Sequence, residues 1–286
     1  MSLITIASVK GSPGVTTLAC LMGASWSTDS RVVVAECDAA GGDLAPRFAL
    51  SRRSGWATLV GAARRDTGDL AVDPHLQRLP GGLEVLVGTT GRELGLHGPS
   101  ARKRAEEALI TLSADLDVLV DLGRLDPDLN RSEPWLGLAD TACIVVPSEP
   151  SSLVHLHERA EEIRERVAGE VYLIVVGEGT YRSDEITRFT GMDVLAMVPY
   201  DPTAASVVTS GIGSRRRLER SALAAAARRI ATMLVDRTTR GGVEAPEAVL
   251  TSGAVDAVGR AEEAESTTTP DTPIGARLKQ SVGTER

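Results

Sequence analysis

The sequence is poor in aromatic residues and holds no long apolar run. Aromatic side chains make up 3% of its 286 residues, whereas hydrophobic residues together make up 42% and charged residues 24%. The core is therefore expected to be aliphatic, as it is where helices cover both faces of a parallel sheet. The composition is ordinary for a globular protein and is enough for one large α/β domain or two small ones.

The sequence contains few cysteines, and its N-terminus does not resemble a targeting signal. The three cysteines, Cys20, Cys37 and Cys143, lie far apart in apolar surroundings, which argues against a disulfide framework or a metal site and indicates reduced core thiols. The N-terminus lacks the basic and apolar segments of a signal peptide, and no stretch reaches the roughly 18 to 20 apolar residues that span a bilayer. We expect a cytoplasmic protein that is neither exported nor membrane-spanning.

The net charge is −8 at pH 7, with a pI near 5.2, which argues against a surface that binds nucleic acid or acidic membrane over its whole extent. Residues 211–240 are a local exception, because they contain eight arginines and two acidic residues, a net charge of 8 − 2 = +6. Arg215, Arg216, Arg217 and Arg220 are the candidate nucleic-acid residues of this segment. The alternatives are a solvated helix face and contact with acidic lipid.

Apolar, strand-like runs alternate with helix-period segments along the first two hundred residues. The runs lie at 3–9, 31–36, 83–88, 117–121, 141–146, 171–176 and 193–198, and the helical segments lie at 16–27, 101–113, 151–167 and 183–190. This order predicts an α/β fold with a doubly wound, mostly parallel sheet and helices on both faces. Ligands of such sheets bind beyond the carboxyl ends of the strands.

A closing helix is predicted at 215–236, with one buried stripe of apolar residues: Leu218, Ala222, Ala226, Ile230 and Met233 or Leu234. The folded domain should span residues 1–240. Residues 241–286 are rich in Gly, Ala, Glu, Thr and Pro and are predicted to form a disordered tail.

A glycine-bearing turn, KGSPGVTT at residues 10–17, follows the first predicted strand and leads into a helix. Such a turn directs backbone N–H groups and the helix dipole at one point and favours phosphate binding. It resembles the deviant Walker A loop, KGGxGKTT, of MinD and ParA proteins, with matches at Lys10, Gly11, Gly14, Thr16 and Thr17. The resemblance implies the SIMIBI-type P-loop fold.

The resemblance assigns roles to this loop. It implies that Lys10 is a catalytic residue that reaches a nucleotide across a homodimer, and that Thr16 is a magnesium ligand. The residues implied to bind the ATP or ADP phosphates are Gly11, Ser12, Gly14, Val15, Thr16 and Thr17. Val15 stands where the family has its in-loop lysine, and Pro13 removes one N–H from the cradle.

Acidic residues follow two of the predicted strands. Glu36 and Asp38 resemble the acidic pair of the family, which implies that Asp38 is associated with magnesium and the attacking water; the alternative is that Asp38 caps a loop. Asp121 resembles the Walker B aspartate that holds Mg²⁺ through water, or is only the first polar residue beyond a buried strand. Leu122, Gly123 and Arg124 follow in place of the family's switch turn.

The base-binding residues of the family are matched in part. Gly177 occupies the position of an adenine-reading asparagine, while Pro199 and Asp201 keep the family's pattern beside the base. The resemblance therefore implies a degenerate site in a CpaE/TadZ-like pseudo-ATPase, a scaffold or regulator that positions a division, chromosome-segregation or pilus-secretion machine through an unknown protein partner. The alternatives are a slow ATPase in which Lys10 compensates across the dimer, and a non-specific DNA-binding partition protein.

Overall fold

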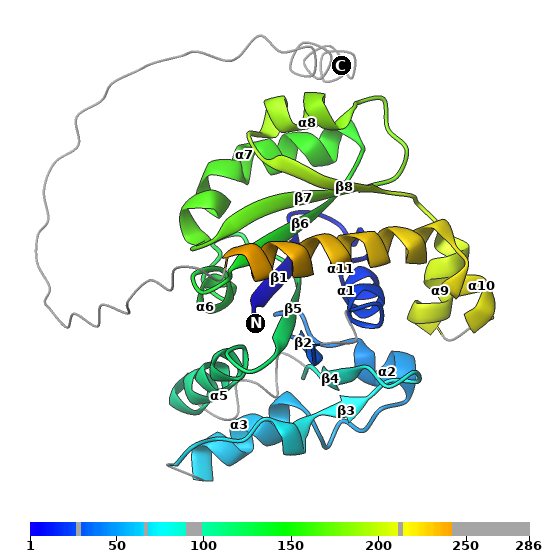
Figure 1. Cartoon of the computed structure of the whole chain (residues 1–286). Helices are drawn as coiled ribbons and strands as arrows, with labels where there is room; N and C mark the ends of the chain where they lie inside the picture. The colour runs from blue at the N-terminus through cyan, green and yellow to red at the C-terminus, as the bar shows by residue number, and fades with distance from the viewer. Residues whose placement is uncertain (27–29, 66–67, 90–98, 211–213, 242–286) are drawn as a thin grey trace, which may run out of the picture.

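The computed structural model describes residues 1–26, 30–65, 68–89, 99–210 and 214–241. In these residues one eight-stranded sheet has the order β3-β4-β2-β5-β1-β6-β7-β8. Its strands are β1 (Leu3–Ser8), β2 (Val32–Glu36), β3 (Gln77–Arg78), β4 (Glu84–Leu86), β5 (Asp117–Arg124), β6 (Thr141–Pro147), β7 (Glu170–Val176) and β8 (Asp193–Val198). Only β3 runs antiparallel to its neighbour, among the strands described. The predicted parallel sheet is confirmed (Figure 1).

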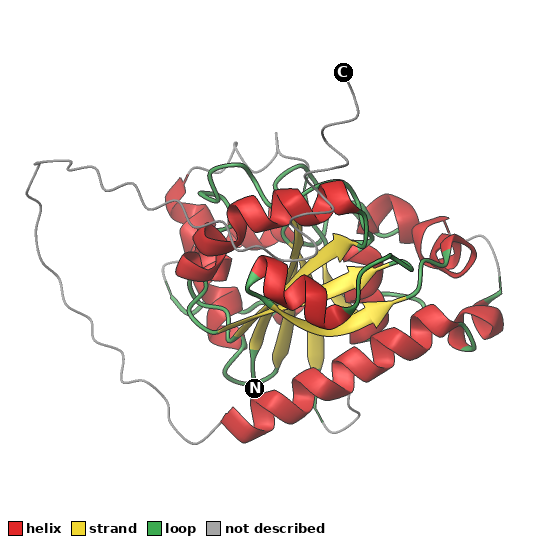
Figure 2. Ribbon diagram, turned by 90° about the horizontal axis from the view of Figure 1, so that it is seen from above, coloured by secondary structure: helices red, strands yellow, loops and turns green. Residues whose placement is uncertain are grey.

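Helices cover both faces of this sheet, as Figure 2 shows. The helices are α1 (Val15–Gly23), α2 (Leu44–Phe48), α3 (Trp56–Arg65), the 3-10 turn η1 (Asp73–His75), α5 (Pro99–Leu112), α6 (Glu133–Leu136), α7 (Pro150–Arg166), α8 (Ser183–Thr190), α9 (Pro202–Ser210), α10 (Arg215–Glu219) and α11 (Ala222–Gly241). The doubly wound architecture predicted from the sequence is confirmed. It places β1 at the centre, between β5 and β6.

Two apolar clusters hold the layers together. The α7-side cluster packs α3, α5 and α7 on one face and includes Leu59, Leu109, Val120, Leu156 and Leu173. The α1-side cluster packs α1 and α11 on the other face and includes Ile4, Leu18, Leu119, Ile174 and Ile230. Successive residues of a strand point to opposite faces, so β5 contributes alternately to both clusters. Both clusters are almost wholly aliphatic, as the composition predicts.

The helix predicted at 215–236 is wrong as a single element, because the chain breaks between Glu219 and Ala222 into α10 and α11. The Ser221 hydroxyl accepts a hydrogen bond from the Ala224 N–H at 3.1 Å, which starts α11 afresh. The buried stripe shifts accordingly: Ala222 is exposed and Leu223 is buried in its place.

Other boundaries also differ from the predictions. The first helix ends at Gly23 instead of residue 27, and β5 continues to Arg124 instead of ending at Asp121. The last helix extends to Gly241, one residue past the predicted domain end, and the predicted tail at 242–286 lies outside the described residues. In the part of the chain that is described, no helix is long and apolar enough to cross a membrane.

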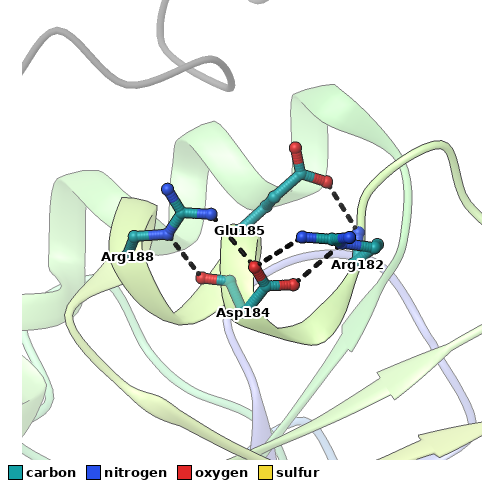
Figure 3. A network of polar contacts seen from close by, with 4 residues as sticks. All are labelled: Arg182, Asp184, Glu185 and Arg188. Carbon is teal, nitrogen blue, oxygen red and sulfur yellow. Dashed lines mark hydrogen bonds and ion pairs between the residues drawn. The ribbon is translucent and has the colours of Figure 1, made fainter.

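The start of α8 is fixed by polar contacts at the surface (Figure 3). The Glu185 carboxylate accepts from the Arg182 backbone N–H at 3.0 Å, and the Asp184 carboxylate accepts from the guanidinium groups of Arg182 and Arg188. Acidic side chains in a first turn also favour the helix dipole. Exposed ion pairs of this kind contribute little each, so they define where α8 begins more than how stable the fold is.

Candidate functional site

The turn between β1 and α1 has the backbone shape of an anion cradle. Gly11 and Gly14 both have positive φ, 73° and 98°, a conformation that residues with a Cβ rarely adopt. Gly14 caps α1 from this left-handed conformation, and no side chain caps the helix. The N–H groups at the start of α1 therefore remain available to an anion, and the helix dipole favours one there.

The loop side chains do not add a cation to this cradle. Val15 is 5% exposed and packs in the α1-side cluster, so its side chain faces the core. Thr17 is also buried, at 6% exposure, whereas Ser12 is exposed. Thr16 is half-buried and lies next to the end of β5. The cradle thus offers backbone donors and one threonine hydroxyl in its first helical turn.

Asp121 lies within β5, three residues before its end, in register with Glu36 of β2 on one side and Ile6 of β1 on the other. Its carboxylate is fully buried: Oδ1 accepts from the Gly123 N–H at 2.9 Å, and Oδ2 has no hydrogen-bond partner among the described residues. Burial raises the pKa of Asp121 to about 7, and the Thr16 hydroxyl lowers it in part. This oxygen can accept a hydrogen bond from a ligand or a water.

Glu36, in contrast, has all its partners within the fold. It is 2% exposed and accepts three backbone N–H bonds, from Asp43 at 2.5 Å, Leu44 at 2.9 Å and Gly88 at 2.8 Å. A Cβ at Gly42 would overlap the same carboxylate, so the loop after β2 packs closely around it. Burial raises the pKa of Glu36, and the three N–H donors oppose that shift. This side chain organises the loops after β2 and β4.

Asp38 follows β2 and is half-buried. Its Oδ1 accepts from the Ala40 N–H at 2.7 Å, the bond of a capped turn. A Cβ at Gly123 would overlap the Asp38 carboxylate, which places this group against the backbone just after Asp121. Burial raises the pKa of Asp38, and the nearby charge of Asp43 adds to the increase. Asp38 therefore both caps its own loop and lies beside Asp121.

The donor set fits one hard cation with few protein ligands. No group of three or more His, Cys, Asp or Glu side chains that could hold a metal ion occurs in the described part of the chain. Mg²⁺, however, keeps several waters and takes one or two protein oxygens plus phosphate oxygens. Thr16 and the partnerless Oδ2 of Asp121 satisfy that requirement, with Asp38 close enough to hold a water.

Lys10 contacts its own chain. The exposed Lys10 Nζ lies 2.7 Å from Nε2 of His155 on α7, and Nδ1 of the same ring lies 3.5 Å from the Glu158 carboxylate. Lysine can only donate, so His155 accepts through Nε2 and carries its proton on Nδ1. His157, two residues away, stacks on Phe189 with ring centroids 4.5 Å apart.

A cavity of about 690 Å³ opens beside the phosphate loop, at the carboxyl ends of β6, β7 and β8. It is lined by Ser12, Pro13, Pro147, Ser148, Glu149, Val176, Gly177, Glu178, Pro199 and Tyr200. Gly177 has a φ of 94° and a Cβ there would lie 3.2 Å from Ser148 Oγ, so a larger residue at 177 would be strained. The volume suits a nucleoside.

Of the two residues predicted beside the base, the structure places only Pro199 in this cavity. Asp201 caps α9 instead, where its Oδ1 accepts from the Ala204 N–H at 2.9 Å. It lines a separate cavity of about 510 Å³ together with Thr203, Ala204, Arg216, Arg217, Arg220 and Ser221. Arg215 forms an ion pair with Glu219 at 2.8 Å, and the four predicted arginines lie on α10 or directly after it.

Two residues near the site, Ser148 and Tyr200, were not predicted, and neither was the contact of His155 with Lys10. Ser148 and Tyr200 directly follow β6 and the Val198 end of β8, so the rule that ligands bind beyond strand ends would have found them. Tyr200 is 75% exposed at the cavity, an unusual state for a large aromatic side chain. No sequence signal connects His155 with Lys10, because only the packing of α7 brings them together.

Comparison with known proteins finds similar folds among solved structures, but no match among family models or curated proteins. No family model matches the sequence, and no curated protein matches it. Among solved structures, a ParA family ATPase from Chlorobium tepidum TLS superposes with a TM-score of 0.66 at 19% identity, covering 82% of this chain and 98% of that chain.

Two MinD structures match in the same way. MinD from Aquifex aeolicus gives a TM-score of 0.61 at 20% identity, covering 82% of this chain and 97% of that chain. MinD from Pyrococcus horikoshii OT3, solved as a complex with Mg-ADP, gives 0.62 at 16% identity, covering 84% and 98%. This chain therefore has the α/β P-loop fold of MinD and ParA proteins.

Proposed function

We propose that this chain is a MinD/ParA-like protein with a degenerate nucleotide site. In this proposal it is a CpaE/TadZ-like pseudo-ATPase, a scaffold or regulator that positions a protein machine of division, chromosome segregation or pilus secretion. The fold likeness to MinD, ParA and a plasmid partition protein supports the positioning role. Function does not follow from fold alone, so the argument depends on the site.

One observation carries the proposal: the lysine position of the loop is filled by a buried valine. Val15 packs in the α1-side cluster, while Thr16 and the partnerless oxygen of Asp121 remain beside the cradle. An isopropyl group neither donates to the β- and γ-phosphates nor neutralises charge that develops between them. Loss of one such contact costs about a hundredfold or more in rate. The site thus keeps residues for binding and lacks the contact for turnover.

Mg²⁺ with ATP or ADP fits this residue set. Thr16 would hold the ion, Asp121 and Asp38 would hold its waters, and the backbone of Gly11 to Gly14 would surround the phosphates. When bound, the ion neutralises phosphate charge and so offsets the acidic surroundings.

A slow ATPase is the alternative, in which Lys10 of a second copy replaces the missing lysine. Phosphate release should be measured at saturating ATP and Mg²⁺ for the wild type and Lys10→Ala, with an active ParA-type ATPase as positive control. We expect both forms to remain at the protein-free background. Wild-type turnover above background that disappears in Lys10→Ala would favour the slow ATPase.

Self-association through the face that bears the phosphate loop is part of the proposal. Lys10 is exposed there, and a second copy would have to displace its bond to His155. Light scattering should detect dimers of the wild type, more of them with ATP and Mg²⁺, and fewer for Lys10→Glu. Lys103→Glu on α5, which makes the same charge change, is the control. A wild type that is monomeric under both conditions at high concentration would contradict the dimer.

Non-specific DNA binding is a second candidate, supported by the arginine-lined cavity at α10. Arg216, Arg217 and Arg220 line it, and none of them has an ion pair among the described residues. Changing all three to Gln should abolish duplex binding and its salt dependence if this candidate is correct. Absence of wild-type binding at low salt would exclude it.

A further inference from the structure

The end of β5 brings an arginine to the phosphate loop. Arg124 is in register with Ser8, the last residue of β1 before the loop. The pairing is held by a hydrogen bond from the Leu125 N–H to the Ser8 carbonyl at 2.9 Å, and by the Ser8 hydroxyl, which donates to the Gly123 carbonyl at 3.3 Å. Neighbouring strands lie about 4.8 Å apart. The backbone of Arg124 is therefore next to the point where the loop begins.

Strand geometry indicates the direction of this arginine. Leu122 and Leu125 are both 2% exposed and belong to the α7-side cluster. Leu122 and Leu125 share a face although they are three positions apart, because Gly123 between them has a φ of 57° and interrupts the alternation. Arg124 takes the face of its register partner Ser8, which lies opposite to that of Ala7 in the α7-side cluster. That face carries α1 and the phosphate loop, and Arg124 is exposed on it.

Arg124 also has no partner within the described structure, whereas the other cations near this edge do. Its guanidinium makes no hydrogen bond or ion pair with any described residue. Lys10 contacts His155, and Arg159 donates to the carbonyls of Asp126 and Pro127 at 3.0 and 3.1 Å. The carboxylates of Asp121 and Asp38 nearby would gain from a cation, yet neither forms an ion pair with it.

We propose that Arg124 supplies the phosphate-binding charge that Val15 lacks, so that the site binds nucleoside di- and triphosphates through a guanidinium. This rests on the proposed nucleotide site. A guanidinium is a planar fork that donates two parallel hydrogen bonds to phosphate oxygens, and it stays charged at any working pH. Arg124 reaches the phosphates from the strand beside the loop, next to the Asp121 end of the site. The arrangement supports affinity without restoring the in-loop contact needed for hydrolysis.

The test is a calorimetric titration of the full-length protein with ADP, AMP and adenosine, each in the presence of Mg²⁺. We expect Arg124→Gln to lower ADP affinity about ten- to hundredfold, the effect of losing a charged hydrogen bond, and to leave adenosine affinity unchanged. Arg124→Lys keeps the charge and should retain part of the ADP affinity. Arg64→Gln, at an exposed arginine in the last turn of α3, is the charge-matched control and should bind like the wild type.

The outcomes separate this inference from the proposed function. Equal ADP affinity in the wild type and Arg124→Gln would overturn the role of Arg124, as would an equal loss for ADP and adenosine. A wild type that binds none of the three ligands would also overturn it, and would leave a nucleotide-independent scaffold standing. ATP turnover by the wild type would overturn the pseudo-ATPase, while the variant's affinity still decides the role of Arg124.

Discussion

The carboxylate side of the site and the phosphate-loop side differ in the side chains that they offer to a ligand. On the carboxylate side, Glu36, Asp38 and Asp121 are present, and at least one of them, Glu36, is required by the fold itself. On the loop side, Val15 packs in the α1-side cluster and Pro13 has no N–H, so neither offers a donor to an anion. Glu36 therefore has a role in the fold that does not depend on a nucleotide.

This difference shows that a matched acidic residue is weak evidence for catalysis. Glu36 satisfies three backbone N–H groups and needs no ligand, whereas Asp121 leaves one buried oxygen without a partner. Only the second arrangement indicates a ligand, because a buried polar atom without a partner costs free energy. The predictions below test whether the two acids differ in this way.

The largest effect is expected from Glu36→Ala. The substitution leaves the N–H groups of Asp43, Leu44 and Gly88 without an acceptor, at a cost of about 3 to 5 kcal/mol in the free energy of unfolding. Urea unfolding followed by circular dichroism measures it. Glu107→Ala, at an exposed residue of α5, is the control and should change stability little. A Glu36→Ala midpoint equal to that of the wild type would contradict the structural role.

Asp121→Asn should stabilise the protein at high pH. The pKa of Asp121 is raised to about 7, so the folded state binds this proton more tightly than the unfolded state. Stability is therefore full below the ordinary Asp pKa near 4 and is lost as pH rises towards 7. Removing the ionisable group should raise the free energy of unfolding by about 4 kcal/mol at pH 8 and by little at pH 4.

Melting temperatures of the wild type and Asp121→Asn across this pH range provide the measurement. The difference between them should grow between pH 4 and pH 8. A constant difference would show that Asp121 is not a strained, buried acid in the ligand-free protein.

A smaller effect is expected from Val15→Lys. A lysine at this position should increase ATP affinity about tenfold, the value of one charged contact, if only the loop cation is missing. Because Val15 is buried, the change also removes apolar contacts, so Val15→Gln serves as a control for that loss. Calorimetric titration compares the two variants. No gain of Val15→Lys over Val15→Gln would mean that Gly177 and the turn after Asp121 also limit binding.

The smallest effect is expected from truncation after Gly241. The composition of the following residues offers too little apolar surface to offset the entropy of ordering them, about 1 to 2 kcal/mol per residue. The melting temperature should be unchanged within a degree or two. A truncated protein that melts many degrees lower would show that the tail packs on the domain.

Much of this architecture could be predicted from the sequence. The central strands are continuous apolar runs, since they are buried on both faces, and the glycines at 11 and 14 mark the turn because only they tolerate its positive φ. The break before α11 could not be predicted, because an arginine- and alanine-rich segment favours a helix throughout and Ser221 gives a weak local signal. The short strand β3 consists of two residues and carries no pattern at all.

The residues of the candidate site could be predicted from the sequence more easily than the contacts that they make. The loop and Asp38 follow β1 and β2, and Asp121 lies on β5 between these two strands, so the three come close together. The separation of Asp201 from Pro199 was not predictable, since a residue two positions on either caps a helix or lines a cavity according to the local turn. The contact of Lys10 with His155 joins residues 145 positions apart and depends on how α7 packs.

The central claim is that the site keeps the groups for binding a nucleotide and lacks those for hydrolysing it. A single-turnover experiment tests this most directly, with protein in excess over ATP and Mg²⁺, quenched over hours and analysed for bound ATP and ADP. The account predicts that the bound nucleotide is recovered as ATP at every time point, with ADP no higher than in a protein-free sample. Conversion of the bound ATP to ADP at the rate of an active ParA-type ATPase would contradict it.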